Sequence, residues 1–189
     1  MKNIAIFASH NGSGFDTILE AINKKKLPIN IALVISNNTN SPVLQKAKDT
    51  NISNYIVNQK NTNDVNARLT ELLKLHECEY IFLSGYMKKL DPLITENFKV
   101  LNTHPSLLPQ YGGEGMYGHY VHEAVIQNKE KKSGVTIHEV DAEYDSGAII
   151  LQKELILSAD ETSKSLEVKI KKLEKEAIVE GLSKYLSIS

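Results

Sequence analysis

The sequence predicts an α/β protein with a doubly wound, mainly parallel, Rossmann-like sheet and helices on both faces. Short continuous apolar segments of strand length alternate along the chain with amphipathic segments of helical spacing, the pattern of strand–helix–strand units. The chain has 189 residues, which is enough for one substantial core and short for two domains. We therefore expect a single domain over residues 1–189, with an N-terminal half of about 1–100 and a C-terminal half of about 101–189.

The first unit of this pattern is a strand, a glycine-containing loop and a helix. Ile4–Ala8 is a buried parallel strand in this interpretation, Ser9–Gly14 forms the loop, and Phe15–Ile22 has helical spacing. Backbone N–H groups at such a helix start bind anions, so a phosphate site and a plain tight turn are both open. Thr17 occupies the third glycine position of the dinucleotide fingerprint, and no acidic residue ends the second strand, which disfavours a nicotinamide cofactor.

The remaining elements follow in the same alternation. After the second strand at 31–35, we expect a helix at 42–50, a short strand at 54–57, a helix at 64–75 and a strand at 80–84. We then expect a strand whose apolar run ends at 100–101, a helix that opens at 119–123, two paired strands at 134–140 and 148–157, and a helix at about 162–186. The last helix places one apolar stripe on its surface, and this stripe indicates core packing: Leu166, Ile170, Leu173, Ala177 and Leu182. Lys171 and Glu174 are three residues apart on that helix, where an exposed ion pair is the simplest expectation.

Bulk composition excludes several function classes. A formal net charge of -1 gives no broad attraction for nucleic acid or an anionic membrane, so neither is an expected partner. Cys78 is the one cysteine, which rules out an internal disulfide. The run Ile4–Ala8 is too short for a signal-peptide core, and no stretch has the length needed to span a bilayer. We expect a cytoplasmic protein.

The most informative stretch is Asn102–Pro109, which reads N-T-H-P-S-L-L-P. Asn102 and His104 follow an apolar run, where a strand is expected to give way to a loop. Side chains two residues apart in a strand point to the same face, so an amide and a titratable imidazole would face one cleft. Pro105 and Pro109 restrict the backbone that follows, which suits a site of fixed geometry.

Two further loops could contribute to such a site. The glycine-rich segment from Tyr111 to His119 is typical of a loop that closes over a ligand. His119 and His122 do not form the His-Glu-x-x-His zinc pattern, and we expect no metal. The acidic residues of loop 141–147 are most simply explained as residues that stabilise a turn. Asp145 becomes a candidate site residue only if the fold brings it to His104.

The N-x-H-P-S-L-L-P block together with Asp145-Ser146-Gly147 resembles the folate-dependent formyltransferases, and the likeness covers essentially the whole chain. The resemblance implies a formyltransferase fold and a one-carbon transferase of purine biosynthesis. It implies that formyl passes from 10-formyltetrahydrofolate, the co-substrate, to the amine of phosphoribosylglycinamide, directly and through a tetrahedral intermediate. These small molecules would be its partners, with the protein a monomer or a homodimer.

The resemblance also implies roles for individual residues. Its catalytic trio corresponds to Asn102, His104 and Asp145, and we expect the carboxylate to favour the charged imidazole. The substrate and its phosphate would be bound in the N-terminal half and the last helix by Asn11, Gly12, Ser13, Gly14, Gly85, Lys171 and Glu174. The folate would be bound by Met87, Lys88, Leu90, Val140, Asp141 and Asp145, and the C-terminal half would be the folate-binding and catalytic half.

This chain departs from the family pattern in two places. Residues 112–119 expand a loop that is shorter in other members, so no substrate contact is carried over to His119 or His122. Lys88 stands where many members have an arginine, which keeps the charge and loses the bidentate fork. Three alternatives stay open: a formyltetrahydrofolate deformylase, a formyltransferase that acts on another amine, and a non-catalytic folate- or nucleotide-binding module.

Overall fold

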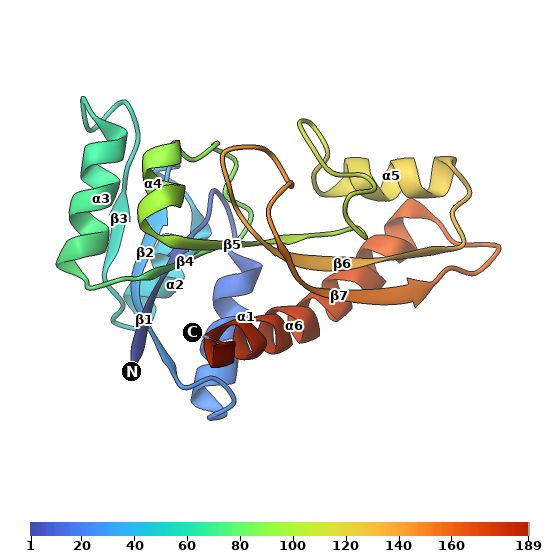
Figure 1. Ribbon diagram of the computed structural model, residues 1–189, viewed down its shortest axis with the longest axis horizontal. Helices are drawn as coiled ribbons and strands as arrows, with labels where there is room; N and C mark the ends of the chain where they lie inside the picture. The colour runs from blue at the N-terminus through green and yellow to red at the C-terminus, as the bar shows by residue number, and fades with distance from the viewer. Residues whose placement is uncertain (189) are drawn as a thin grey trace. The chain divides into compact units, whose positions relative to one another are not determined.

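A computed structural model describes residues 1–188 and confirms the α/β class. Seven strands of the described chain form a mostly parallel sheet in the order β3-β2-β1-β4-β5-β6-β7 (Figure 1). β1 pairs in parallel with both β2 and β4, and β2 pairs in parallel with β3. β6 and β7 are antiparallel, as the paired strands of the sequence predict. Ser189, the last residue of the expected domain, lies outside the described residues.

The elements follow the predicted order closely. The strands are β1 (Lys2–Phe7), β2 (Ile29–Ser36), β3 (Asn54–Ile56), β4 (Tyr80–Leu83), β5 (Lys99–His104), β6 (Lys132–Glu139) and β7 (Ile149–Ile156). The helices are α1 (Ser13–Asn23), α2 (Pro42–Asp49), α3 (Val65–Leu75), α4 (Pro92–Asn97), α5 (His119–Gln127) and α6 (Ser163–Ile188). No helix within 1–188 is both long and apolar enough to cross a membrane.

The chain forms two compact units, Met1–Leu101 and Asn102–Ser189. In the first unit, β1 is buried from Ile4 onward because its continuous apolar run has no polar face to expose. The first three helices turn apolar faces to this core, with α1 contributing Phe15 and Ile18 and α3 contributing Leu69 and Leu72. The carboxyl ends of β1, β2 and β4 carry the loops discussed below.

The second unit packs α5 and α6 against each other, and α6 against the β6–β7 pair (Figure 1). The predicted stripe of α6 is buried at Leu166, Ile170, Ala177 and Leu182, whereas Leu173 is only half-buried. Gly181 lets the helix backbone approach β6, because a Cβ at that position would lie 2.9 Å from Ile137. This packing fixes β6, which carries part of the site.

Two local features differ from the expectation. The short helix α4 was not predicted; it begins with Pro92 at its first position and is capped by the Asp91 carboxylate, which accepts from the Leu93 amide at 2.9 Å. β5 continues beyond the apolar run that ends at 100–101 and includes both Asn102 and His104, which the sequence placed where the strand gives way to a loop. Both residues therefore sit on regular strand backbone, which holds their side chains more firmly than a loop would.

Candidate active site

The second unit fixes the backbone that follows His104 through a buried network. Thr136 of β6 donates its hydroxyl to the Ser106 carbonyl at 2.7 Å and accepts from the Leu108 amide at 3.0 Å. Gln152 of β7 donates to the same hydroxyl at 3.0 Å and to the Leu108 carbonyl at 2.8 Å. The segment after β5 is thus bonded to two strands, and the end of β5 is held in place.

His104 is buried with both ring nitrogens engaged. Its Nε2 lies 2.7 Å from the carbonyl oxygen of Tyr111. A carbonyl only accepts hydrogen bonds, so Nε2 carries the proton and Nδ1 is the atom that titrates. Nδ1 lies 3.5 Å from Oδ2 of Asp145. The imidazole and the carboxylate that the resemblance paired are therefore neighbours within this unit.

Asp145 reaches the site because its loop folds back sharply. The residue has φ 54, in the left-handed region that non-glycine residues seldom adopt. Gly147 allows the loop to fold back close to the end of β6, since a Cβ at position 147 would lie 1.9 Å from the Glu139 carbonyl oxygen. Gly112 lies on the opposite side, where a Cβ would come within 3.2 Å of Asp145 Cβ, and the next amide, that of Gly113, donates to Oδ2 at 2.9 Å.

His138 joins the group, and sequence reasoning missed it. This residue of β6 is 1% exposed, and its Nε2 lies 3.2 Å from Asn102 Nδ2 and 3.5 Å from Asp145 Oδ1. Asp145 thus lies between two imidazoles, those of His104 and His138. A signal was present, because His138 alternates with Thr136 on one face of a predicted strand, but that face could have been ordinary core.

Burial and charge set the protonation of this group. Burial lowers the pKa of His104, and the raising effects of the Asp145 charge and the Tyr111 carbonyl do not overcome it. Burial alone would raise the pKa of Asp145, but His138, the charge of His104 and the Gly113 amide lower it below the usual value. The charge of Asp145 favours the charged imidazole, as expected, but desolvation of the ring is the larger effect, so the net shift of the His104 pKa is downward.

The two predicted substrate residues of α6 behave differently from each other. Lys171 forms its ion pair with Glu167 rather than with Glu174, so the expected Lys171–Glu174 pair was wrong. Burial raises the pKa of Glu174, opposed by the Thr103 hydroxyl and the Lys171 charge. Thr103 follows Asn102 on β5, so this helix face lies beside the strand that carries Asn102 and His104.

In the first unit, the predicted phosphate loop has the backbone of an anion site. Gly12 adopts φ 64 and ψ 55 ahead of α1, and a Cβ there would lie 2.5 Å from Val43. Gly14 donates its amide to the buried Ser84 hydroxyl at 2.8 Å. The amides of Asn11, Gly12 and Ser13 donate to no backbone carbonyl of residues 1–188. Such amides at a helix start are the donors that anions use.

Ser9 ties this loop to the other predicted residues of the first unit. Its hydroxyl accepts from the Met87 amide at 2.7 Å and donates to Asn37 at 2.6 Å, and its own amide donates to the Gly85 carbonyl at 3.2 Å. Met87 and Lys88 are exposed, whereas Leu90 is buried. The loops after β1, β2 and β4 therefore form one connected edge.

The predicted folate loop of the second unit is a hydrogen-bonded turn. Asp141 is exposed, and its carboxylate accepts from the Ser146 hydroxyl at 2.7 Å and the Glu143 amide at 2.9 Å. The Ser146 bond is the largest of the effects that lower the pKa of Asp141. Val140 is half-buried beside it. The acidic loop therefore stabilises a turn, as the sequence predicts, and any contact with folate would be a second role for these residues.

The glycine-rich loop ends in an exposed aromatic group. The rings of Tyr117 and Tyr120 meet edge to face at 5.3 Å, and His119 lies against Tyr120 at 4.0 Å. His122, one helical turn along, is buried, and burial lowers its pKa. Among residues 1–188, no group of three or more histidine, cysteine or acidic side chains is arranged to hold a metal ion.

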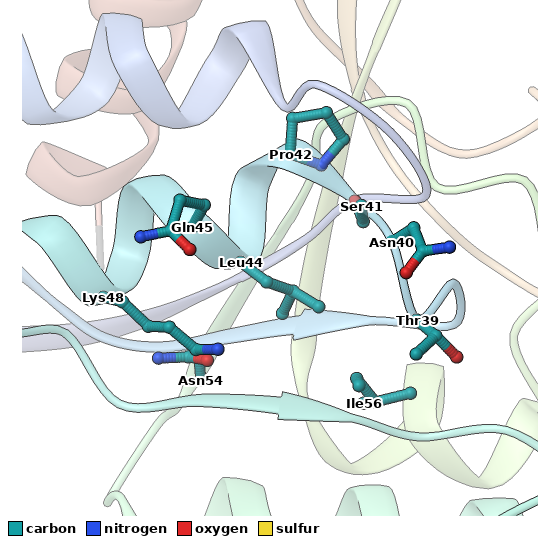
Figure 2. A pocket seen from close by; sticks show the side chains of 9 residues that line it. All are labelled: Thr39, Asn40, Ser41, Pro42, Leu44, Gln45, Lys48, Asn54 and Ile56. Atoms are coloured by element: carbon teal, nitrogen blue, oxygen red, sulfur yellow. The ribbon is translucent and has the colours of Figure 1, made fainter.

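A separate hollow of about 450 Å³ lies in the first unit between the start of α2 and β3 (Figure 2). Ser41, Gln45, Lys48 and Asn54 are among its polar lining residues. Ser41 also donates to the His10 carbonyl at 2.6 Å, so the hollow adjoins the loop after β1. None of the residues predicted to be functional lines it.

A family model described as formyl transferase matches residues 2–182, and the chain belongs to this family.

Several similar proteins carry the name phosphoribosylglycinamide formyltransferase. Phosphoribosylglycinamide formyltransferase of Haemophilus influenzae is 33% identical over 179 residues, which are 92% of this chain and 82% of that protein. A chloroplastic phosphoribosylglycinamide formyltransferase of Vigna unguiculata is 32% identical over 95% of this chain, and this chain spans 59% of its length. The crystal structure of phosphoribosylglycinamide formyltransferase from Bacillus halodurans has a TM-score of 0.88 at 29% identity, covering 98% of this chain and 96% of that one.

Proposed function

We propose that this protein transfers the formyl group of 10-formyltetrahydrofolate to the amine of phosphoribosylglycinamide, a step of purine biosynthesis. The observation that carries the proposal is the convergence of Asn102, His104 and Asp145 in one buried group of the second unit. The names of the similar proteins support the substrate pair. Under this proposal 10-formyltetrahydrofolate is consumed as a co-substrate, and the protein acts in the cytoplasm.

The chemistry begins with attack of the substrate amine on the formyl carbon. The attack builds a tetrahedral intermediate whose oxygen becomes negative, and the amide of Asn102 can donate to that oxygen. Holding amine and formyl carbon in contact supplies a further large part of the acceleration. No covalent bond to the protein is required, and Cys78 lies between α3 and β4 in the first unit, buried, with its pKa raised to about 12 by burial.

Proton transfer is the task of His104 and Asp145. With Nε2 held by the Tyr111 carbonyl and its pKa lowered, His104 is neutral at the start and Nδ1 can accept a proton. The attacking amine loses one proton and the departing folate nitrogen gains one, so a single site that accepts and then returns a proton balances the reaction. The carboxylate of Asp145, 3.5 Å away, stabilises the imidazolium in between.

Binding is assigned by the same proposal to the remaining predicted residues. Asn11 to Gly14 and Gly85 would hold the phosphate end of the substrate, with Lys171 and Glu174 near the sugar. Met87, Lys88, Leu90, Val140 and Asp141 would line the folate cleft. The N-terminal half is then the phosphate-binding half and the C-terminal half the catalytic and folate-binding half.

An assay of folate release tests the proposal against its alternatives. The purified protein is incubated with 10-formyltetrahydrofolate with and without phosphoribosylglycinamide, and release of tetrahydrofolate is followed. We expect release only when the amine is present. Release that is independent of the amine would identify a deformylase, and thermal stabilisation by the folate without turnover would identify a binding module.

A further inference from the structure

His138 differs from the other buried groups around the site in what it contacts. Thr136, two residues earlier on the same face of β6, bonds to the backbone of the loop after β5. His138 instead contacts two members of the trio, Asn102 at 3.2 Å and Asp145 at 3.5 Å, and the carbonyl of its neighbour Glu139 at 2.8 Å. Packing alone would need an apolar side chain of this size, not an imidazole.

The tautomer of His138 follows from the Glu139 contact. The atom 2.8 Å from the Glu139 carbonyl oxygen is Nδ1, and a carbonyl oxygen can only accept. Nδ1 therefore carries the proton of the neutral ring, and Nε2 presents its lone pair. Nε2 in turn accepts a hydrogen bond from whatever donor faces it.

Nε2 faces the amide nitrogen of Asn102 at 3.2 Å and, at the longer distance of 3.5 Å, the carboxylate oxygen Oδ1 of Asp145. Oδ1 can only accept, so of these two groups Asn102 alone can donate to the lone pair of Nε2. An amide turned by 180° would place its oxygen against the lone pair of Nε2, and the two would repel. His138 thus selects one of the two orientations of the Asn102 carboxamide. The amide nitrogen has two hydrogens, so one binds His138 and the other stays available as a donor.

We propose that His138 is a positioning residue for formyl transfer, which holds the Asn102 amide with its second N–H toward the oxygen of the tetrahedral intermediate. The inference rests on the proposed function. Without His138, the amide could turn and present its oxygen to the developing negative charge. The donor would then be lost for part of the time, whereas the substrate-binding loops would be unchanged.

The tautomer can be tested without any activity measurement. Nitrogen NMR of protein labelled in its histidine rings distinguishes a protonated Nδ1 from a protonated Nε2, and comparison with His138→Gln assigns the signal. We expect the neutral ring of His138 to be protonated at Nδ1. A ring protonated at Nε2 could not accept from Asn102 and would overturn the inference.

Kinetics then test the positioning role with a matched set of variants. His138→Leu removes the acceptor and keeps the volume, and we expect kcat to fall on the order of 10²-fold, the typical effect of losing one oxyanion donor, with KM for both substrates unchanged. His138→Gln keeps an acceptor near the Nε2 position and should retain most of the wild-type kcat. His76→Leu, at the end of α3, is the control for a histidine-to-leucine change, and thermal melts check that each variant is folded.

A double-mutant cycle separates positioning from general loss of structure. If His138 acts through Asn102, then His138→Leu should have little effect on kcat in a protein that already carries Asn102→Ala. Equal losses in both backgrounds would overturn the inference. An inactive wild-type protein would instead refute the proposed function, and the NMR result would still decide the tautomer.

Discussion

Each compact unit contains one group of loop and strand-end residues, and the two groups differ in the kind of polar atoms that they contain. The edge around Ser9, Gly12 and Gly14 in the first unit is held by backbone amides, carbonyls and neutral hydroxyls. The group around His104, His138 and Asp145 in the second unit consists of ionisable side chains, with each buried imidazole 3.5 Å from the Asp145 carboxylate. Neutral dipoles can hold an anion without titrating, whereas proton transfer needs groups whose charge can change. We therefore expect binding to depend on the first group and chemistry on the second.

The largest effect should come from His104→Ala. Removing the proton acceptor should lower kcat by about 10²- to 10⁴-fold, the usual range for general acid–base groups, while the dissociation constant of phosphoribosylglycinamide changes little. Single-turnover rates and calorimetric titration measure the two quantities separately. A variant that lost affinity and kept its rate would reverse the division of labour between the two groups.

Asn102→Asp sharpens the same contrast at the oxyanion donor. The substitution keeps shape and replaces two N–H donors by a second acceptor, so kcat should fall by about 10²- to 10³-fold. Steady-state kinetics at saturating substrate concentrations measure this loss. If Asn102→Asp were as active as the wild-type protein, the side chain would not contact the developing charge.

In the first unit, alanine substitutions at two glycines distinguish the energetic cost of a steric clash from that of a left-handed backbone. Gly12→Ala adds a left-handed penalty and a clash with Val43, so it should cost about 2–4 kcal/mol of unfolding free energy. Gly85→Ala is the matched control, with φ 67 and no atom within 4 Å of a Cβ, and should cost about 1–2 kcal/mol. Urea unfolding compares the two variants. If both variants lost the same unfolding free energy, the tight packing of the glycine loop would make no contribution to stability.

Acid sensitivity should originate in the second unit. Burial lowers the pKa values of His104 and His122 in the folded protein, so the unfolded chain binds more protons as the pH falls below about 6.5. Stability should then decrease on acidification, by up to about 1.4 kcal/mol per pH unit for each ring. Urea unfolding at several pH values should give a shallower slope for His122→Leu than for the wild-type protein. Identical slopes would show that His122 does not contribute.

The smallest effect concerns Glu174, whose pKa is raised by burial. In the folded protein, Glu174 prefers its protonated form more strongly than in the unfolded chain. The protonated side chain therefore adds to the free energy of unfolding at low pH, and this contribution is lost as the pH rises above the ordinary pKa of glutamate. Glu174→Gln removes the charge and should stabilise the protein slightly at neutral pH. The same change should raise KM for phosphoribosylglycinamide if Glu174 contacts the sugar. Thermal melts and kinetics on one preparation measure both, and a destabilised variant with normal KM would contradict this account.

Much of the fold could be predicted because its signals are local. Continuous apolar runs gave the buried strands, and helical spacing gave the stripe of Leu166 and Ile170. The helix α4 was missed because six residues carry too little periodicity to stand out. The sequence placed Asn102 and His104 at the end of a strand, but because both are polar it could not show that the regular strand extends through His104.

Site residues could be predicted from the sequence only where they belong to a recognisable motif. Asn102 and His104 were found through the N-x-H-P-S-L-L-P block, and Asp145 was found through the Asp145-Ser146-Gly147 element. Their convergence in space could not be read from spacing, since Asp145 lies 41 positions beyond His104 (145 − 104). His138 lacked a motif, and its role depends on contacts between β5 and β6. The sequence indicated that Asp145 favours the charged form of His104, but it could not reveal that burial of the ring lowers the His104 pKa by more than Asp145 raises it.

The most direct test of the whole account follows the fate of the formyl carbon. 10-Formyltetrahydrofolate labelled at that carbon is mixed with phosphoribosylglycinamide and the protein, and the label is then located. We predict that each molecule of tetrahydrofolate released corresponds to one labelled formamide on the glycinamide amine, with no free formate. Label that appears as formate, or that stays on the folate, would contradict the claim that the buried group of the second unit transfers formyl to an amine.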